Sequence, residues 1–186
     1  MQEKLISAKS YWTAQEAGDY DRSSSTRKIQ HEMTERLIQE TGCDKTLDVG
    51  CGTGFSMEIL GEEAFGVDVS YEMLKLAKKK GFDRLVMADF RALPFKAGAF
   101  NSLVSISALQ WVTGKSPEDV REQYAAAFAE MSRVLSKGGR AGLQFYPATE
   151  KEWELARKEA AKLFAGNVIE EGESKKQKRY LILNKM

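Results

Sequence analysis

The sequence contains few of the residues that build disulfide scaffolds or zinc sites. Its 186 residues include 2 cysteines, Cys43 and Cys51, and 1 histidine, His31. Two cysteines are too few for a disulfide framework, and one histidine leaves no Cys/His cluster for zinc. We therefore expect no bound metal and a protein of a reducing, cytoplasmic compartment.

Signals for membrane insertion and secretion are also missing. No apolar run approaches the roughly 18 residues that a membrane-spanning helix needs, and the start, MQEKLISAKSYW, lacks the apolar core of a signal peptide. The formal net charge is only +1, so the chain as a whole has no electrostatic attraction to nucleic acid. With only 3 prolines and no low-complexity stretch, residues 1–186 are predicted to form a single domain.

Strand and helix patterns alternate along the chain from residue 23 onward. Ile29, Met33 and Leu37, at four-residue spacing, indicate the apolar face of the first helix. Strands are expected over 45–50, 64–69, 84–90, 100–109 and 140–147, helices over 23–42, 55–61, 70–81, 117–137 and 150–164, and a closing antiparallel hairpin over 167–172 and 178–184. This alternation predicts an α/β, Rossmann-like doubly wound sandwich, whose ligands bind beyond the carboxyl ends of the strands.

The stretch LDVGCGTGFS, residues 47–56, concentrates three glycines directly after the first predicted strand. A phosphate-binding P-loop would need Lys-Ser/Thr after the glycines, and a dinucleotide fold would have G-x-G-x-x-G. Here Gly50, Gly52 and Gly54 are spaced G-x-G-x-G, with Asp48 two residues earlier. This D-x-G-x-G-x-G pattern resembles motif I of class I S-adenosylmethionine (SAM) methyltransferases, in which glycines allow the backbone to lie against the ligand.

The resemblance implies roles for acids at three successive strand ends. Asp48 would face the ammonium group of SAM, Asp68 would accept both ribose hydroxyls, and Asp89, followed by Phe90, would take the adenine amino group. Each acid alone is typical of a turn or a helix cap, but the three together predict SAM binding. The other expected cofactor contacts are Tyr11 and Arg22 from a lid that, with the first helix, spans residues 1–42, the space-filling Cys51, and Val69, Met73 and Ser105.

Longer stretches narrow the resemblance. YDRSSSTRKIQHEMTERLIQ, LPFKAGAFNSLVSISALQWV and LQFYP resemble the family of small-subunit ribosomal RNA guanine-N7 methyltransferases, which act on 18S rRNA in eukaryotes. The resemblance implies a seven-stranded sheet of order 3-2-1-4-5-7-6, SAM as cofactor, and small-subunit rRNA or a pre-ribosomal particle as substrate. Eukaryotic members carry a long basic C-terminal extension, whereas this sequence ends at Met186, which suggests a prokaryotic, archaeal-type member.

Guanine N7 has a free lone pair and can attack a sulfonium methyl without prior deprotonation. Catalysis then depends on placing the two groups in line, and no general base is expected. In keeping with this, Ser105-Ile106-Ser107-Ala108 stands in the place of N/D-P-P-Y, the motif of exocyclic-amine methyltransferases. Trp111 and Tyr146 would sandwich an unstacked base, and Gln110 would hydrogen-bond its edge. A structural role for Trp111, as a core anchor of the following helix, remains equally open.

The predicted strand 84–90 lies at an edge of the sheet in the strand order that the resemblance implies. Leu85, Val86 and Met87 place three consecutive apolar residues there, which favours a covering partner. The family pairs with a small zinc-binding methyltransferase activator protein, and strand addition at this edge would explain the pattern. A basic cluster over residues 175–179 is either a solvated hairpin loop or a contact to RNA phosphates.

Two other functions remain open on sequence grounds. The first is a small-molecule or acyl-carrier carboxyl methyltransferase, which would need an extra cap between the fifth strand and the next helix. A single residue separates Pro147 from Thr149, which leaves no room for such a cap. The second is a SAM-fold ribosome assembly factor, and an intact set of cofactor acids does not exclude a scaffolding role.

Overall fold

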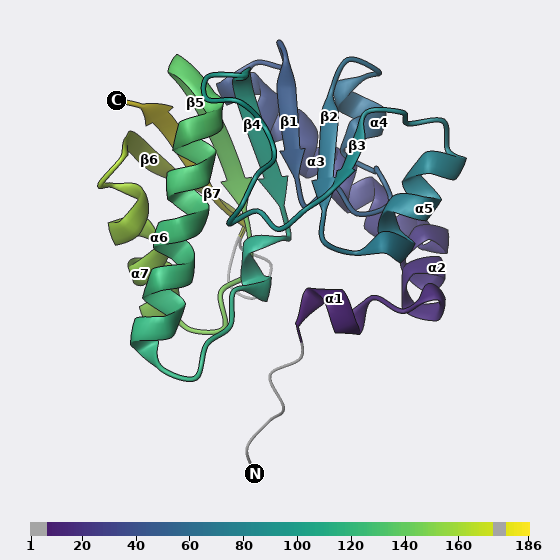
Figure 1. Cartoon of the computed structure of the whole chain (residues 1–186), viewed down its shortest axis with the longest axis horizontal. Helices are drawn as coiled ribbons and strands as arrows, with labels where there is room; N and C mark the ends of the chain where they lie inside the picture. The colour runs from purple at the N-terminus through teal and green to yellow at the C-terminus, as the bar shows by residue number, and fades with distance from the viewer. Residues whose placement is uncertain (1–6, 173–177) are drawn as a thin grey trace.

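One mixed sheet of seven strands forms the centre of the computed structural model (Figure 1), which describes residues 7–172 and 178–186. The order is β3-β2-β1-β4-β5-β7-β6, as predicted. The five strands β1–β5 pair in parallel, whereas β7 runs antiparallel to both β5 and β6. The strands are β1 Thr46–Val49, β2 Phe65–Asp68, β3 Leu85–Met87, β4 Phe100–Ile106, β5 Leu135–Gln144, β6 Phe164–Glu171 and β7 Lys178–Lys185.

Helices cover both faces of the sheet, with α6 in front of it and α3 behind it in Figure 1. Leu103 of β4 packs into the core cluster of α6, and the next residue, Val104, packs into the cluster that contains Met33 and Leu37 of α3. Successive strand residues point to opposite faces, so β4 contributes to both cores. The helices are α1 Ala8–Tyr11, α2 Ala14–Arg22, α3 Ser24–Thr41, α4 Met57–Leu60, α5 Tyr71–Lys79, α6 Pro117–Val134, α7 Glu150–Ala160 and the 3-10 helix η1 Leu109–Trp111.

The strands β3 and β4 each end three residues earlier than the sequence predicts. β3 stops at Met87 because Asp89 begins a turn in which its carboxylate accepts the backbone N–H of Arg91 at 2.9 Å. β4 stops at Ile106 because Ser107 has a φ of 55°, a left-handed conformation that a strand cannot continue through. Both early ends lie at the carboxyl edge of the sheet, where a ligand is expected.

The boundary between α6 and β5 also differs from the prediction. The helix was expected to extend to residue 137, just before the glycines at 138–139, but α6 ends at Val134 and Leu135 already pairs with Phe100 of β4. Gly138, with a φ of 74°, lies inside β5, where the register shifts between Phe100 and Ser102. The glycines therefore serve a strand irregularity and not a helix end.

The N-terminal segment forms two short helices that the sequence analysis did not predict. Ser7 and Thr13 accept the N-terminal amides of α1 and α2 as side-chain caps. At the other end of the chain, β6 and β7 form the predicted antiparallel hairpin, with β6 beginning at Phe164. Within the described ranges, none of the helices combines the length and the apolar character needed to cross a membrane.

Candidate functional site

A cavity of about 640 Å³ lies at the carboxyl ends of the parallel strands. Its walls combine residues from the N-terminal segment, from residues 50–56 after β1, which we call the glycine loop, from the ends of β2, β3 and β4, and from α6. Among the predicted site residues, the lining includes Tyr11, Gly50, Gly52, Asp68, Val69, Met73, Asp89, Phe90, Gln110 and Trp111. The structure therefore brings together residues that lie up to 100 positions apart in the sequence.

The glycine loop is tied to β2 at its start. The backbone N–H groups of Gly50 and Cys51 both donate to the carbonyl of Val67, at 2.7 and 3.0 Å. Gly50, Gly52 and Gly54 have φ values of 79°, 55° and 88°, a left-handed region in which residues with a Cβ are strained. The loop can therefore follow this path along the cavity because these positions are glycine.

Two of these glycines are required for different reasons. A Cβ at Gly50 would lie 2.3 Å from the Cβ of Ala108, so this glycine allows the loop to contact the segment after β4. A Cβ at Gly52 would have only the Cε of Met73 nearby, at 3.8 Å, and Gly52 lines the cavity. An added side chain there would project into the open space, so Gly52 keeps the cavity accessible to a ligand.

Asp68 presents its carboxylate at the cavity wall. One oxygen accepts the N–H of Gly52 at 2.9 Å, and the other accepts the N–H of Ser70 at 2.8 Å. Burial raises the pKa of the Asp68 carboxyl, and these backbone hydrogen bonds partly oppose that shift. The two amides fix the carboxylate at the end of β2, in an orientation suited to accepting further hydrogen bonds.

Asp48 is fully buried below the glycine loop and does not line the cavity. Its Oδ2 accepts the hydroxyl of Ser56 at 2.5 Å, whereas its Oδ1 has no hydrogen-bond partner among the described residues. Burial raises the pKa of the Asp48 carboxyl to about 7. A buried carboxylate oxygen without a partner favours a nearby cation or donor, which a ligand at the loop would supply.

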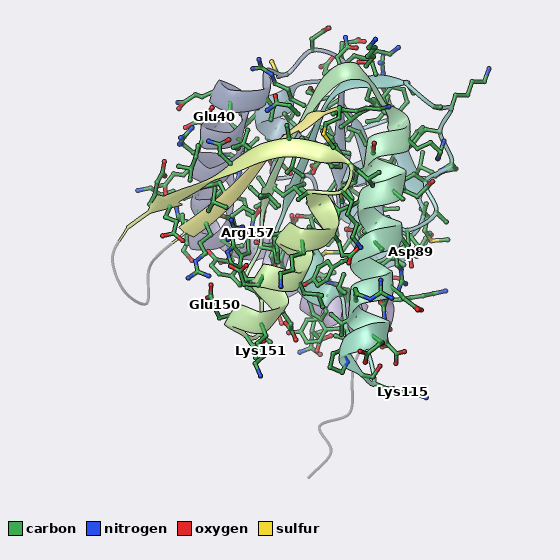
Figure 2. All side chains as sticks on the ribbon, turned by 90° about the vertical axis from the view of Figure 1, so that its left-hand side faces the viewer. Glu40, Asp89, Lys115, Glu150, Lys151 and Arg157 are labelled. Carbon is green, nitrogen blue, oxygen red and sulfur yellow. The ribbon has the colours of Figure 1, made fainter. Side chains whose placement is uncertain are left out.

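Asp89 is already engaged by a neighbouring arginine. The guanidinium of Arg91 pairs with the Asp89 carboxylate and also donates to Gln123 Oε1 of α6 at 2.6 Å. This contact holds the pKa of the Asp89 carboxyl below its usual range. Figure 2 shows Asp89 beside α6, with Lys115 at the N-terminal end of that helix.

Four of the five aromatic residues that line the cavity contact one another and form what we call the aromatic mouth: Tyr11, Trp12, Tyr20 and Trp111. The ring of Trp111 lies 5.0 Å from that of Tyr11 and 5.8 Å from that of Trp12, between ring centroids. Tyr20 stacks on Phe55 of the glycine loop at 5.4 Å. The segment 8–22, which we call the lid segment, therefore contacts both the glycine loop and η1.

An ion pair fastens the lid segment to α5. Lys80 pairs with Asp21 at 2.5 Å, and its ammonium lies 4.2 Å from the ring centroid of Phe55. Both side chains of the pair are about three-quarters buried, with exposures of 25% and 22%. The pair and the stacked ring of Tyr20 fix α2 over the loop.

Several predicted site residues lie outside the cavity lining, and their roles stay predictions. Tyr146 is 49% exposed, and its backbone N–H donates to Gln110 Oε1 at 3.4 Å. Arg22 pairs with Asp19 on the surface. Cys51 is buried in a cluster with Met57 and Leu74. Gly54 faces the protein interior, because a Cβ there would lie 2.7 Å from Phe82. The Ser105 hydroxyl donates to the carbonyl of Val49 at 2.7 Å.

The structure also adds cavity residues that the sequence analysis did not select. Gln30 and Ser107 line the cavity together with Arg91 and Gln123. Gln30 lies on the buried face of α3, whereas Ile29, which the periodicity placed on that face, is 43% exposed. The spacing of Gln30, Met33 and Leu37 also fits one face of a helix, so counting the buried face from residue 30 in place of residue 29 would have identified Gln30.

The sheet order, the glycine loop and the acids at the strand ends define a class I SAM-dependent methyltransferase. A family model described as a methyltransferase domain matches residues 47–143. The chain is 35% identical over 181 residues to the 18S rRNA (guanine-N(7))-methyltransferase bud23 of Schizosaccharomyces pombe, covering 90% of this chain and 68% of that protein. It is 34% identical over 189 residues to the 18S rRNA (guanine-N(7))-methyltransferase of Bos taurus, covering 93% and 67%. The chain therefore belongs to the family of 18S rRNA guanine-N7 methyltransferases.

Solved structures share the fold at lower identity. A SAM-dependent methyltransferase from Aquifex aeolicus superposes with a TM-score of 0.69 at 18% identity, covering 94% of this chain and all of that one. A chain from the complex of the Trm112 methyltransferase activator of Haloferax volcanii gives a TM-score of 0.68 at 13% identity, with 100% of both chains covered. These likenesses show that the sheet and its helices follow a common plan.

The cofactor of this class is SAM, and two observations test whether these residues fit it. The open face of Gly52 leaves room for a ligand to lie against the backbone. Beneath the glycine loop, the buried Oδ1 of Asp48 has no hydrogen-bond partner among the described residues, and the cationic amino-acid end of SAM at the loop would supply one. The residues at the cavity therefore fit the cofactor.

Proposed function

We propose that this chain transfers a methyl group from SAM to N7 of a guanine in small-subunit ribosomal RNA. The observation that carries the proposal is the cavity, in which the glycine loop, Asp68 and Asp89 adjoin the aromatic mouth. Its relatives' activity supports the substrate class. SAM supplies an electrophilic methyl group on its sulfonium.

On this proposal the acids position the cofactor. Asp68 accepts the ribose hydroxyls, and Asp89 accepts the adenine amino group beside Phe90. Asp48 faces the ammonium with its unpartnered oxygen. None of these groups exchanges a proton with the acceptor base, because guanine N7 attacks through its own lone pair. Rate enhancement then comes from alignment, which can supply up to about 7–11 kcal/mol of a barrier.

The aromatic mouth receives the acceptor base. On this proposal Trp111, which contacts Tyr11, stacks on an unstacked purine, and Gln110, the preceding lining residue, hydrogen-bonds its edge. Tyr146, at the exposed end of the segment after β5, is proposed as the outer contact of the base. Stacking contributes about 1–3 kcal/mol per base, enough to select an unstacked nucleotide.

The two other functions make different predictions about substrate. The connection from β5 to α7 covers only residues 145–149, so the cavity has no extra cap of the kind that encloses small acids or acyl chains. Incubation with tritium-labelled SAM and total small-subunit rRNA, against a panel of small carboxylic acids, separates the activities. We expect label in the RNA, at a guanine that borohydride–aniline cleavage maps as N7-methylated. Label in the acids alone would refute the proposal, and no label in either would favour an assembly factor.

The exposed edge at β3 is the proposed binding site for a small zinc-binding activator protein. β3 is the outermost strand on its side of the sheet, and Met87 on it is 59% exposed. The fold likeness to a chain that was solved in complex with a methyltransferase activator supports this partner. Met87→Pro should remove co-purification with the activator by blocking strand addition. Met186→Pro, at a residue 68% exposed, is the control, and equal co-purification of both variants would exclude this edge.

We further propose that residues 1–186 act as one domain in the cytoplasm. The rRNA substrates of the relatives and the unpaired thiols of Cys43 and Cys51 support a reducing compartment near ribosomes. In the basic cluster, Lys178 lies 3.5 Å from Glu32, and Arg179 lies 2.7 Å from Glu150. These pairings favour a structural hairpin, while residues 175–177 of the cluster lie outside the described part of the chain.

A further inference from the structure

Two buried glutamines and one half-buried serine from distant elements form a hydrogen-bonded chain next to the cavity. Gln30 of α3 donates from Nε2 to the Ser107 hydroxyl at 3.3 Å, and that hydroxyl donates to Gln144 Oε1 of β5 at 3.3 Å. Gln30 is 7% exposed and Gln144 is 1% exposed. Burying a side-chain amide costs free energy unless hydrogen bonds within the protein replace those to water, so these bonds define the position of each amide.

The central residue of this chain is held in a strained conformation. Ser107 has a φ of 55°, and its backbone N–H donates to the carbonyl of Gln144 at 2.8 Å. Left-handed backbone at a residue other than glycine costs free energy and concentrates at functional sites. Gln144 Nε2, in turn, is buried and has no hydrogen-bond partner in the described part of the chain.

The chain of hydrogen bonds ends in the cavity. Both Gln30 and Ser107 are lining residues, as is Ala108, which lies against Gly50 of the glycine loop. On the proposed function, the amino-acid half of SAM and its methyl group lie near this glycine. An acceptor base must therefore bring its reacting nitrogen close to Gln30 and Ser107.

The orientation of the Gln30 carboxamide follows from its neighbours. The Ser107 hydroxyl gives its proton to Gln144, so it can only accept from Gln30, which turns Nε2 toward Ser107. Among the described residues this is the only hydrogen bond of the Gln30 side chain. The second N–H of Gln30 Nε2 and the oxygen Oε1 are left for a ligand, and the bond to Ser107 fixes which side of the carboxamide donates and which side accepts.

We propose that Gln30, oriented by Ser107 and Gln144, reads the O6 and N1–H edge of the acceptor guanine. The free N–H matches the O6 acceptor, which adjoins N7 on the ring, and the carbonyl matches the N1–H donor. Adenine presents a donor and an acceptor in the opposite order, and the fixed carboxamide cannot turn to match it. This assignment rests on the proposed function and gives it a source of base specificity.

The test uses a synthetic RNA that carries the mapped target guanine and a copy with 2-aminopurine at that position. 2-Aminopurine keeps N7 and stacks like guanine but lacks both O6 and N1–H. With the wild-type protein we expect kcat/KM for methyl transfer to be about 10- to 100-fold higher for the guanine RNA. Gln30→Leu should lower activity on the guanine RNA and bring that ratio close to one, with the affinity for SAM unchanged.

Two further variants separate base reading from folding. Gln39→Leu changes an exposed glutamine on the same helix and should leave the ratio at its wild-type value. Ser107→Gly removes the hydroxyl but relieves the left-handed strain, so it should fold stably and still lower the ratio. A Gln30→Leu variant that keeps the wild-type ratio, or loses activity equally on both RNAs, would overturn the assignment. A wild-type protein that methylates neither RNA would overturn the proposed function, and the assignment with it.

Discussion

Replacement of Asp68 tests the proposed orientation of the cofactor most directly. Its two oxygens accept the N–H groups of Gly52 and Ser70, at 2.9 and 2.8 Å, and have lone pairs left for two ribose hydroxyls. Hydrogen bonds to a charged group contribute about 1.5–3 kcal/mol each. Loss of two therefore removes about 3 kcal/mol or more, which corresponds to at least a roughly 100-fold weaker Kd for SAM at 1.4 kcal/mol per tenfold.

The assay is isothermal titration calorimetry of SAM with wild type, Asp68→Ala and Asp68→Asn. The asparagine variant keeps one carbonyl acceptor and should fall between the other two proteins. Asp83→Ala removes a surface acid whose side chain is 80% exposed and should bind SAM as wild type does. Native circular dichroism together with an unchanged Kd for Asp68→Ala would refute the ribose assignment.

Three further predictions concern the acid below the loop, the lid and the mouth. The pKa of Asp48 is about 7 in the folded chain against an ordinary 3.8, so the folded state binds the extra proton and its stability falls as pH rises through that window. Urea unfolding of the SAM-free protein should show this fall, and Asp48→Asn should reduce it, leaving the smaller contribution of Asp68, whose pKa burial also raises. Lys80→Met removes the ion pair with Asp21 and the cation–π contact with Phe55, worth about 1–2 kcal/mol together. Stopped-flow fluorescence should therefore show SAM dissociating several-fold faster. An unchanged dissociation rate would mean that the ion pair does not hold the lid segment in place. Trp111→Ala should raise the KM for RNA about 10- to 100-fold with SAM affinity unchanged and with Trp111→Phe close to wild type, and a parallel loss of thermal stability would instead identify a core anchor.

Much of the fold follows from patterns that act locally. Short apolar strands alternating with capped helices specify a parallel sheet, so the elements after residue 22 could be predicted. The end of α6 could not, because pairing of Leu135 with Phe100 overrides the helix-stopping glycines three positions later. The lid helices were missed because their caps, Ser7 and Thr13, precede segments without an apolar stripe.

The candidate site could likewise be predicted only in part from the sequence. Asp68 and Asp89 could be placed together because the carboxyl ends of parallel strands meet at one edge of a sheet. The contact between Gln30 and Ser107 could not be predicted, since the two residues lie 77 positions apart and belong to no shared motif. Only the packing of α3 against β4 brings them together. The ion pair between Arg91 and Asp89 also could not be predicted, because it depends on the orientation of the Arg91 side chain and not on the positions of the two residues in the sequence.

The lid segment has a consequence for the order of events in turnover. Trp12 lies 5.3 Å from Tyr20 and 5.8 Å from Trp111, so one ring links the part of the lid over the glycine loop to the part over η1. A displacement of Trp12 that uncovers Trp111 for an incoming nucleotide would therefore also disturb the contact of Tyr20 with the glycine loop. Admission of RNA and exchange of the cofactor product would then share one motion, so an RNA that keeps Trp111 uncovered would also leave the product free to dissociate.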